Sequence, residues 1–148
     1  SPIGRKHVAC VNRLTDLFTG RLGKRAIVSV QNPIRLDDLY EPQPDVVLAR
    51  PREDFYVQAL PGPADILLLV EAADSSLEAD RDFKLPLYAR NGVVEVWVAD
   101  LAAGVLKVYR RPGAAGYGET QRFARGQGVT AGAFPDVTFL VEEAIGPA

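Results

Sequence analysis

ILLLVE, at residues 66–71, is the most informative stretch of the sequence for the fold. Its five apolar residues leave no polar face, which predicts a strand over residues 65–73 in the middle of a sheet. Glu71 ends this run, and burying an ionised carboxylate costs several kcal/mol unless it is paired, protonated or bound to a cation. The stretch therefore predicts both a central strand and a carboxylate that needs a partner.

A second carboxylate begins the preceding strand. Residues 41–45 read EPQPD, and their two prolines fix an extended entry into the apolar run at 46–49. If the two strands are neighbours, Asp45 and Glu71 meet at one end of the sheet. Their repulsion would be relieved by a hard divalent ion, for which we expect Mg²⁺, with Mn²⁺ as the alternative.

The other segments predict helices packed on a mixed sheet. Apolar residues recur at three- and four-residue steps over residues 7–22, which is typical of a helix with one buried stripe. The fold class expected is α/β (α+β), with additional strands at the C-terminus. The remaining expected elements are a strand at 26–30 that resumes at 34–36, a loop at 50–63, a helix at 75–90 ended by Asn91-Gly92, a hairpin of 93–100 with 105–110, and weaker strands at 119–124 and 137–141.

Length and composition favour one domain over residues 1–148. Hydrophobic residues make up 47% of the chain and charged residues 24%, which excludes a disordered chain, and the net charge is -2. A polyanion must therefore be held by a local patch. The longest apolar run, residues 64–70, is too short to span a bilayer, so we expect no membrane association. Cys10 is the one cysteine, which fits a reducing cytoplasm. The chain begins at Ser1 and has no Met, so we expect a native N-terminal segment to be missing.

Lys84 is a third candidate, on the helix that follows Glu71. The chain has four Lys and thirteen Arg, so a Lys on the helix after Glu71 mildly favours a role at the site. Its compact charge could orient a water molecule or offset charge on a phosphate. Asp80 stands four residues earlier and can pair with it. Two carboxylates, a metal ion and a lysine together predict a phosphodiester-cleaving site.

Several motifs resemble the Uma-type restriction endonuclease family of the PD-(D/E)XK, or restriction-endonuclease-like, superfamily. The resemblance covers nearly the whole chain, from about His7 to Ile145. The order DRxxKLxxYAxxGV followed by ExWxxD is the most specific part. The matching stretches are PD at 44–45, LVE at 69–71, DRDFKLPLYARNGV at 80–93 and EVWVAD at 95–100.

The resemblance implies a restriction-endonuclease-like sheet flanked by helices, with Asp45 and Glu71 as metal ligands. The family's usual lysine stands two residues after the glutamate, where this chain has Ala73. Lys84 resembles its migrated replacement. Gln31 resembles a polar position on an earlier strand near the site, and His7 resembles the histidine that opens the first core helix.

Each candidate also has a purely structural interpretation. Lys84 could be a solvated lysine paired with Asp80, because exposed pairs at this spacing are common and weak. His7 and Gln31 could be structural residues. Tyr88 is expected to pack among apolar neighbours. Arg81 and Arg90 are candidates to steer a nucleic-acid backbone, or they form a solvated helix face.

The first hypothesis for function is a Mg²⁺-dependent endonuclease that hydrolyses DNA phosphodiester bonds. A second is a catalytically inactive module that keeps the nuclease fold for interaction or regulation, and a third is a hydrolase of small phosphate esters. Many nucleases of this kind cut two strands as dimers, so a homodimer is expected by analogy. Nothing in the sequence reads bases, so no recognition site is predicted.

Overall fold

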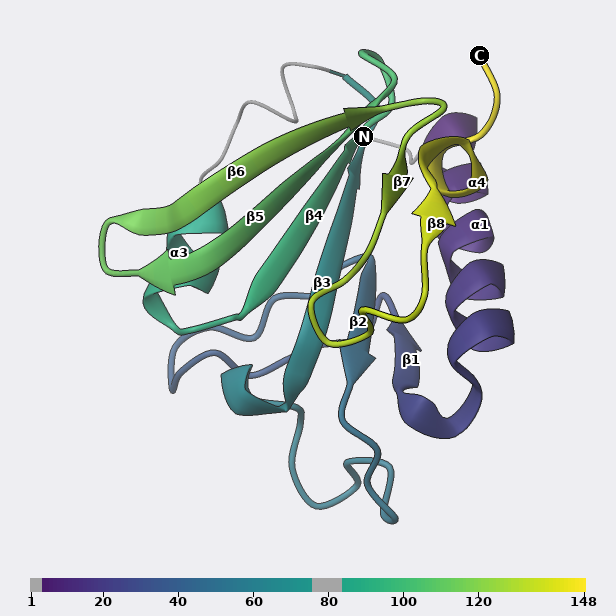
Figure 1. The fold of residues 1–148 in the computed structure, drawn as a ribbon. Coiled ribbons are helices and arrows are strands. Elements are labelled where there is room, and N and C mark those ends of the chain that lie inside the picture. The colour runs from purple at the N-terminus through teal and green to yellow at the C-terminus, as the bar shows by residue number, and fades with distance from the viewer. Residues whose placement is uncertain (1–3, 76–83) are drawn as a thin grey trace.

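One six-stranded mixed sheet forms the centre of the molecule. A computed structural model describes residues 4–75 and 84–148. The strand order is β1-β2-β3-β4-β5-β6; β3 and β4 pair in parallel and the other neighbours are antiparallel. Figure 1 shows the sheet twisted between its helices. The predicted fold class is confirmed. The strands are β1 (Ile27–Val30), β2 (Val46–Ala49), β3 (Ile66–Ala73), β4 (Glu95–Asp100), β5 (Val105–Gly113) and β6 (Gly116–Ala124).

The helix α1 (Arg5–Leu22) covers one face of the sheet and has the predicted apolar stripe. The stripe packs on the β-strand residues of the same face, with Phe18 6.1 Å from Trp97 between ring centroids. Its buried members are Cys10, Val11, Leu14, Phe18 and Leu22. No helix in the described ranges is long and apolar enough to cross a membrane.

The helix α3 (Lys84–Arg90) covers the opposite face through Leu85, Tyr88 and Ala89. Pro86 lies in its first turn, where the missing N–H needs no helical partner. Gly92, at φ +82°, ends the helix as predicted. The predicted helical residues 76–83, which include the candidates Asp80 and Arg81, lie outside the described residues.

The C-terminal segment differs from the expectation of a strand at 137–141. Only β8 (Phe139–Leu140) is extended, and it pairs with β7 (Gly128–Val129) in a separate two-stranded sheet. Helix α4 (Val141–Ile145) then begins and lies beside α1 (Figure 1). Glu142 and Glu143 fall in its first turn, where acidic side chains favour helix over strand. The predicted continuation of β1 at 34–36 is likewise not a strand, because its N–H groups bond to loop carbonyls.

The buried carboxylate of Glu95 forms an ion pair between β4 and β5. Glu95 is 3% exposed, and its Oε1 lies 3.1 Å from the Arg110 Nε. It also accepts hydrogen bonds from the indole N–H of Trp97 and the backbone N–H of Gly132. These partners compensate the cost of burying its charge.

Candidate active site at the ends of β2 and β3

Asp45 and Glu71 lie side by side at one end of the sheet. The antiparallel register pairs Val46 with Val70, which places the two acids at the next position along the ladder. The backbone N–H of Asp45 donates a hydrogen bond to Glu71 Oε1 at 3.0 Å. The structure therefore brings together the two carboxylates that the strand pattern predicted to meet.

The Asp45 carboxylate is fixed from two sides. Its Oδ2 accepts the backbone N–H of Ala72 at 2.9 Å and lies 3.1 Å from His7 Nε2. His7 comes from the start of α1, so the helix that covers one face of the sheet reaches the end of β2. Within residues 4–75 and 84–148 both bonds go to Oδ2, so Oδ1 can bind another group. The Asp45 side chain is 15% exposed, so such a group can enter.

Glu71 meets two residues of α3. Its Oε2 accepts the hydroxyl of Tyr88 at 3.2 Å and lies 3.6 Å from Lys84 Nζ. Lys84 and Tyr88 are four residues apart, so one face of α3 presents both side chains. The site thus combines two strand carboxylates with an amine and a hydroxyl from a helix.

Burial raises the pKa of Glu71 above its ordinary value. The neighbouring Lys84 acts in the opposite direction and Asp45 adds to the rise. Burial and Glu71 also raise the pKa of Tyr88, which keeps its phenol protonated and able to donate. A cation bound between Asp45 and Glu71 would stabilise the charged forms of both carboxylates.

The donor set fits Mg²⁺. Among the described residues no group of three or more His, Cys, Asp or Glu side chains is arranged to hold a metal ion. Mg²⁺ requires fewer, because it is commonly held by one or two carboxylates and keeps several waters. Asp45 and Glu71 supply two hard oxygen donors beside a partly open surface.

Gln31 and Arg90 lie at the edge of this group. The backbone N–H of Gln31 donates to the Asp45 carbonyl at 3.0 Å, while its side chain is exposed and its φ is +54°. Arg90 is exposed at the end of α3 and shares a pocket with Lys84. Within the described residues, Gln31 therefore contacts Asp45 through the backbone alone, and Arg90 is linked to the site only through the pocket that it shares with Lys84.

Tyr88 is the site residue whose polar contact the sequence did not predict. Tyr88 is 1% exposed and packs in the core as expected, while its hydroxyl donates to Glu71 Oε2. The one sequence signal was its spacing of four residues from Lys84. Buried tyrosines usually find a hydrogen-bond partner, so the packing role and the site role coexist.

Comparison with known proteins identifies the family and a similar fold. The model of the Uma2 family, described as "Putative restriction endonuclease", matches residues 1–142. A crystal structure from Anabaena variabilis ATCC 29413, described as "a putative nuclease belonging to DUF820", superposes with a TM-score of 0.70 at 16% identity. The match covers 97% of this chain and 82% of the other. Curated proteins gave no match. The structural match shows the fold, the description of the family supports a nuclease, and the chain belongs to the Uma2 family.

Proposed function

We propose that the protein is a Mg²⁺-dependent endonuclease that hydrolyses DNA phosphodiester bonds. The observation that carries the proposal is the meeting of Asp45, Glu71 and Lys84 at one end of the sheet. Two carboxylates next to a lysine are the groups that metal-assisted phosphodiester cleavage requires.

Each residue has a distinct part in this proposal. Asp45 and Glu71 hold the metal ion, which when bound acidifies a water molecule and polarises the scissile phosphate. His7 keeps the Asp45 carboxylate oriented through Oδ2. Lys84 orients the attacking water or offsets the charge that develops on the phosphate. Its side chain is 43% exposed, so the amine can turn from Glu71 to a substrate.

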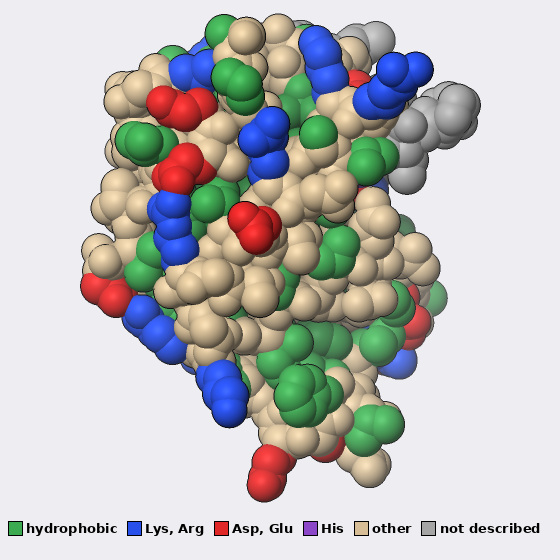
Figure 2. Space-filling view, turned by 90° about the vertical axis from the view of Figure 1, so that its right-hand side faces the viewer, with side chains coloured by type: hydrophobic (Ala, Val, Ile, Leu, Met, Phe, Trp, Pro, Cys, Tyr) green, Lys and Arg blue, Asp and Glu red, His purple; other side chains and the backbone are tan. Residues whose placement is uncertain are grey.

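A local basic patch supports DNA as the substrate. Lys6, Arg13 and Arg125 line one depression of about 520 Å³ beside the start of α1. Figure 2 shows one face of the molecule, with several Lys and Arg side chains toward the top and Asp and Glu side chains interspersed among them. Lys6 precedes His7, the residue whose Nε2 lies 3.1 Å from Asp45 Oδ2. The patch is the local positive surface that a chain of net charge -2 needs to hold a polyanion.

Plasmid cleavage tests the proposal. Supercoiled plasmid is incubated with Mg²⁺ or Mn²⁺ and wild-type protein, Glu71→Gln or Asp16→Asn. Asp16 is an exposed carboxylate of α1 and serves as the matched control. We expect nicking by wild type and Asp16→Asn, and its loss in Glu71→Gln. Equal cleavage by all three proteins would remove the claim.

An inactive module is the second candidate, because Ala73 stands where the family usually has its lysine. Calorimetry with Mg²⁺ and Mn²⁺ separates the two functions. Heat of binding that disappears in Glu71→Gln supports the enzyme, and no binding at millimolar metal supports the module.

We also propose that cleavage of both strands uses a homodimer. The support is analogy with enzymes that cut duplex DNA with two copies of one site. Size-exclusion chromatography with light scattering tests it. A monomer at high protein concentration, with or without DNA, would contradict the dimer.

A further inference from the structure

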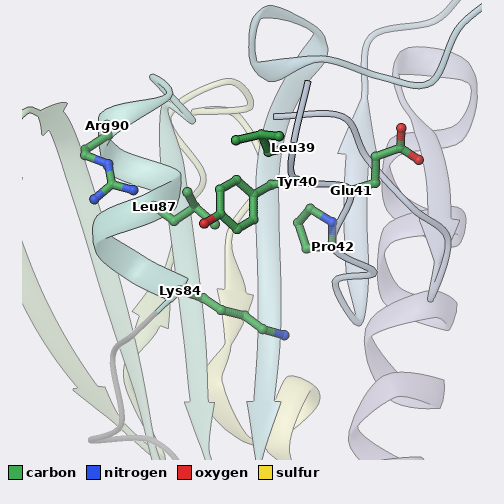
Figure 3. Close-up of a pocket in the computed structure, with 7 residues that line it drawn as sticks. All are labelled: Leu39, Tyr40, Glu41, Pro42, Lys84, Leu87 and Arg90. Atoms are coloured by element: carbon green, nitrogen blue, oxygen red, sulfur yellow. The ribbon is translucent and has the colours of Figure 1, made fainter. Parts of the chain in front are cut away.

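A pocket of about 460 Å³ lies next to the candidate active site. It is bounded by residues 39–42 on one side and by Lys84, Leu87 and Arg90 of α3 on the other. Figure 3 shows the Tyr40 ring beside Leu87, with Lys84 and Arg90 at different heights along the helix. Lys84 belongs both to the pocket and to the Glu71 contact, so the pocket is continuous with the site.

The loop that carries Tyr40 is fixed by its own hydrogen bonds. Asp37 Oδ1 accepts the backbone N–H groups of Leu39 and Tyr40, at 2.7 and 3.0 Å. The Leu36 N–H bonds to the Tyr40 carbonyl at 3.1 Å. The loop nevertheless holds its apolar side chains outward, with Leu39 86% and Tyr40 47% exposed. A well-bonded loop that presents an aromatic ring to solvent is suited to binding a flat apolar surface.

Arg90 is a charged side chain of the pocket that can bind a ligand. Arg90 forms no hydrogen bond or ion pair within residues 4–75 and 84–148. The acidic lining residue, Glu41, is engaged by Arg35 at 3.3 Å. The Arg90 guanidinium can therefore bind a phosphate through two N–H groups.

We propose that this pocket binds one unpaired nucleotide of the substrate strand, beside the linkage to be cut. Its base stacks on Tyr40 against Leu39 and Leu87, and Arg90 contacts its phosphate. This inference rests on the proposed nuclease function and extends it to a substrate class, namely a single strand or a duplex with a locally unpaired base.

The size and the position of the pocket favour this occupant. Its volume lies within the roughly 300–1,000 Å³ of small-ligand sites. Bases in an intact duplex have their faces covered by neighbours, so an exposed tyrosine can stack only on a base that has left the stack. Because Lys84 joins the pocket to Glu71, a nucleotide there lies beside the proposed cleavage position.

Fluorescence of DNA oligonucleotides containing one 2-aminopurine tests the pocket. Binding is followed by anisotropy and stacking by quenching, in the Glu71→Gln background so that no cleavage occurs. We expect Tyr40→Ala to weaken single-strand binding by about fivefold or more and to abolish quenching, and Tyr40→Phe to retain both. Phe55→Ala, which removes an aromatic side chain that is 74% exposed in the loop at the other end of β2, is the matched control and should change neither.

Three outcomes separate this inference from the proposed function. Equal binding and equal quenching by Tyr40→Ala and its Glu71→Gln parent, together with DNA cleavage by the wild-type protein, would overturn the nucleotide pocket alone. Tyrosine-dependent quenching in a wild-type protein that cuts no DNA would overturn the endonuclease and support the pocket. Loss of single-strand binding in Arg90→Gln, with no loss in Arg50→Gln, supports the phosphate contact.

Discussion

Lys84 Nζ lies 3.6 Å from Glu71 Oε2, although the two residues belong to different elements. Glu71 ends the apolar core of β3 and Lys84 begins α3. The amine therefore reaches the carboxylate from a helix, while the position two residues after Glu71 is filled by the buried Ala73.

Replacement of Lys84 by Met is expected to separate metal binding from cleavage. Cleavage should fall by about 100-fold, because a group that stabilises the reacting phosphate or its water is lost. Metal affinity should stay the same or rise, since the cation that competes at Glu71 Oε2 is gone. Plasmid nicking and calorimetry measure the two effects. A parallel loss of cleavage and of metal binding would show that Lys84 has a structural role instead.

Glu71→Gln is expected to remove metal binding without loss of stability. The amide keeps an oxygen that can accept the Asp45 N–H. It also removes the negative charge whose burial raises the pKa of Glu71. In thermal unfolding without metal the variant should melt at or above the wild-type temperature. Excess Mg²⁺ should raise the wild-type temperature only. A large drop without metal would show instead that the carboxylate is a structural ion-pair partner.

His7→Ala should weaken metal binding by about 10-fold or more, because Asp45 Oδ2 loses the partner that orients it. His7→Gln, whose amide can donate to the same oxygen, should recover part of the loss. Titration of Mg²⁺ into the three proteins gives the affinities. Identical values would mean that the Ala72 N–H alone is enough to orient Asp45.

Removal of Arg110 is expected to affect stability and leave the site intact. Arg110→Met strips the buried Glu95 of its cation, which should cost about 3 kcal/mol in the free energy of unfolding. Adding Glu95→Gln should restore part of it, because the uncompensated charge is then gone. Urea unfolding measures both, and Arg111→Met, an exposed neighbour, is the control.

Acid should weaken the ion pairs that join the C-terminal segment to Arg21 and Arg25. Hydrogen bonds from Arg21 and Arg25 lower the pKa values of Glu143 and Asp136. Their contribution is therefore complete above the unfolded pKa of about 4 and is lost as the pH falls through the depressed folded values. NMR titration should show the Glu143 pKa return toward its ordinary value in Arg21→Ala. No change would mean that the Leu140 N–H, which also bonds to Glu143, sets it.

The sequence predicted the elements well where the apolar pattern is long. The continuous apolar run at 66–71 predicted a central strand and the apolar stripe at 7–22 predicted a helix, and the structure has β3 and α1 at these places. The two-residue strands β7 and β8 are too short to show a period, so only tertiary pairing defines them. The same limit explains the error at Val141, where one apolar residue fits either a strand or a helix.

The site was predictable to the extent that strands position it. Asp45 and Glu71 meet because their strands are neighbours, which the two apolar runs already favoured. The Tyr88 hydroxyl contact was missed because an aromatic residue among apolar neighbours indicates packing alone. His7 was indicated only through family resemblance, since nothing local links it to a residue 38 positions away.

The division of the group between β-strands and α3 has an evolutionary consequence under the proposed function. Cation coordination is encoded by the strand pair, while the amine and phenol are encoded by seven helical residues. Leu85, Tyr88 and Ala89 of that segment are buried in the core, whereas the Lys84 side chain is 43% exposed, so loss of the amine alone would silence hydrolysis and spare folding and ion capture. Descendants of such a protein can therefore become regulators through one substitution, and a new amine on a nearby element can restore the lost reaction.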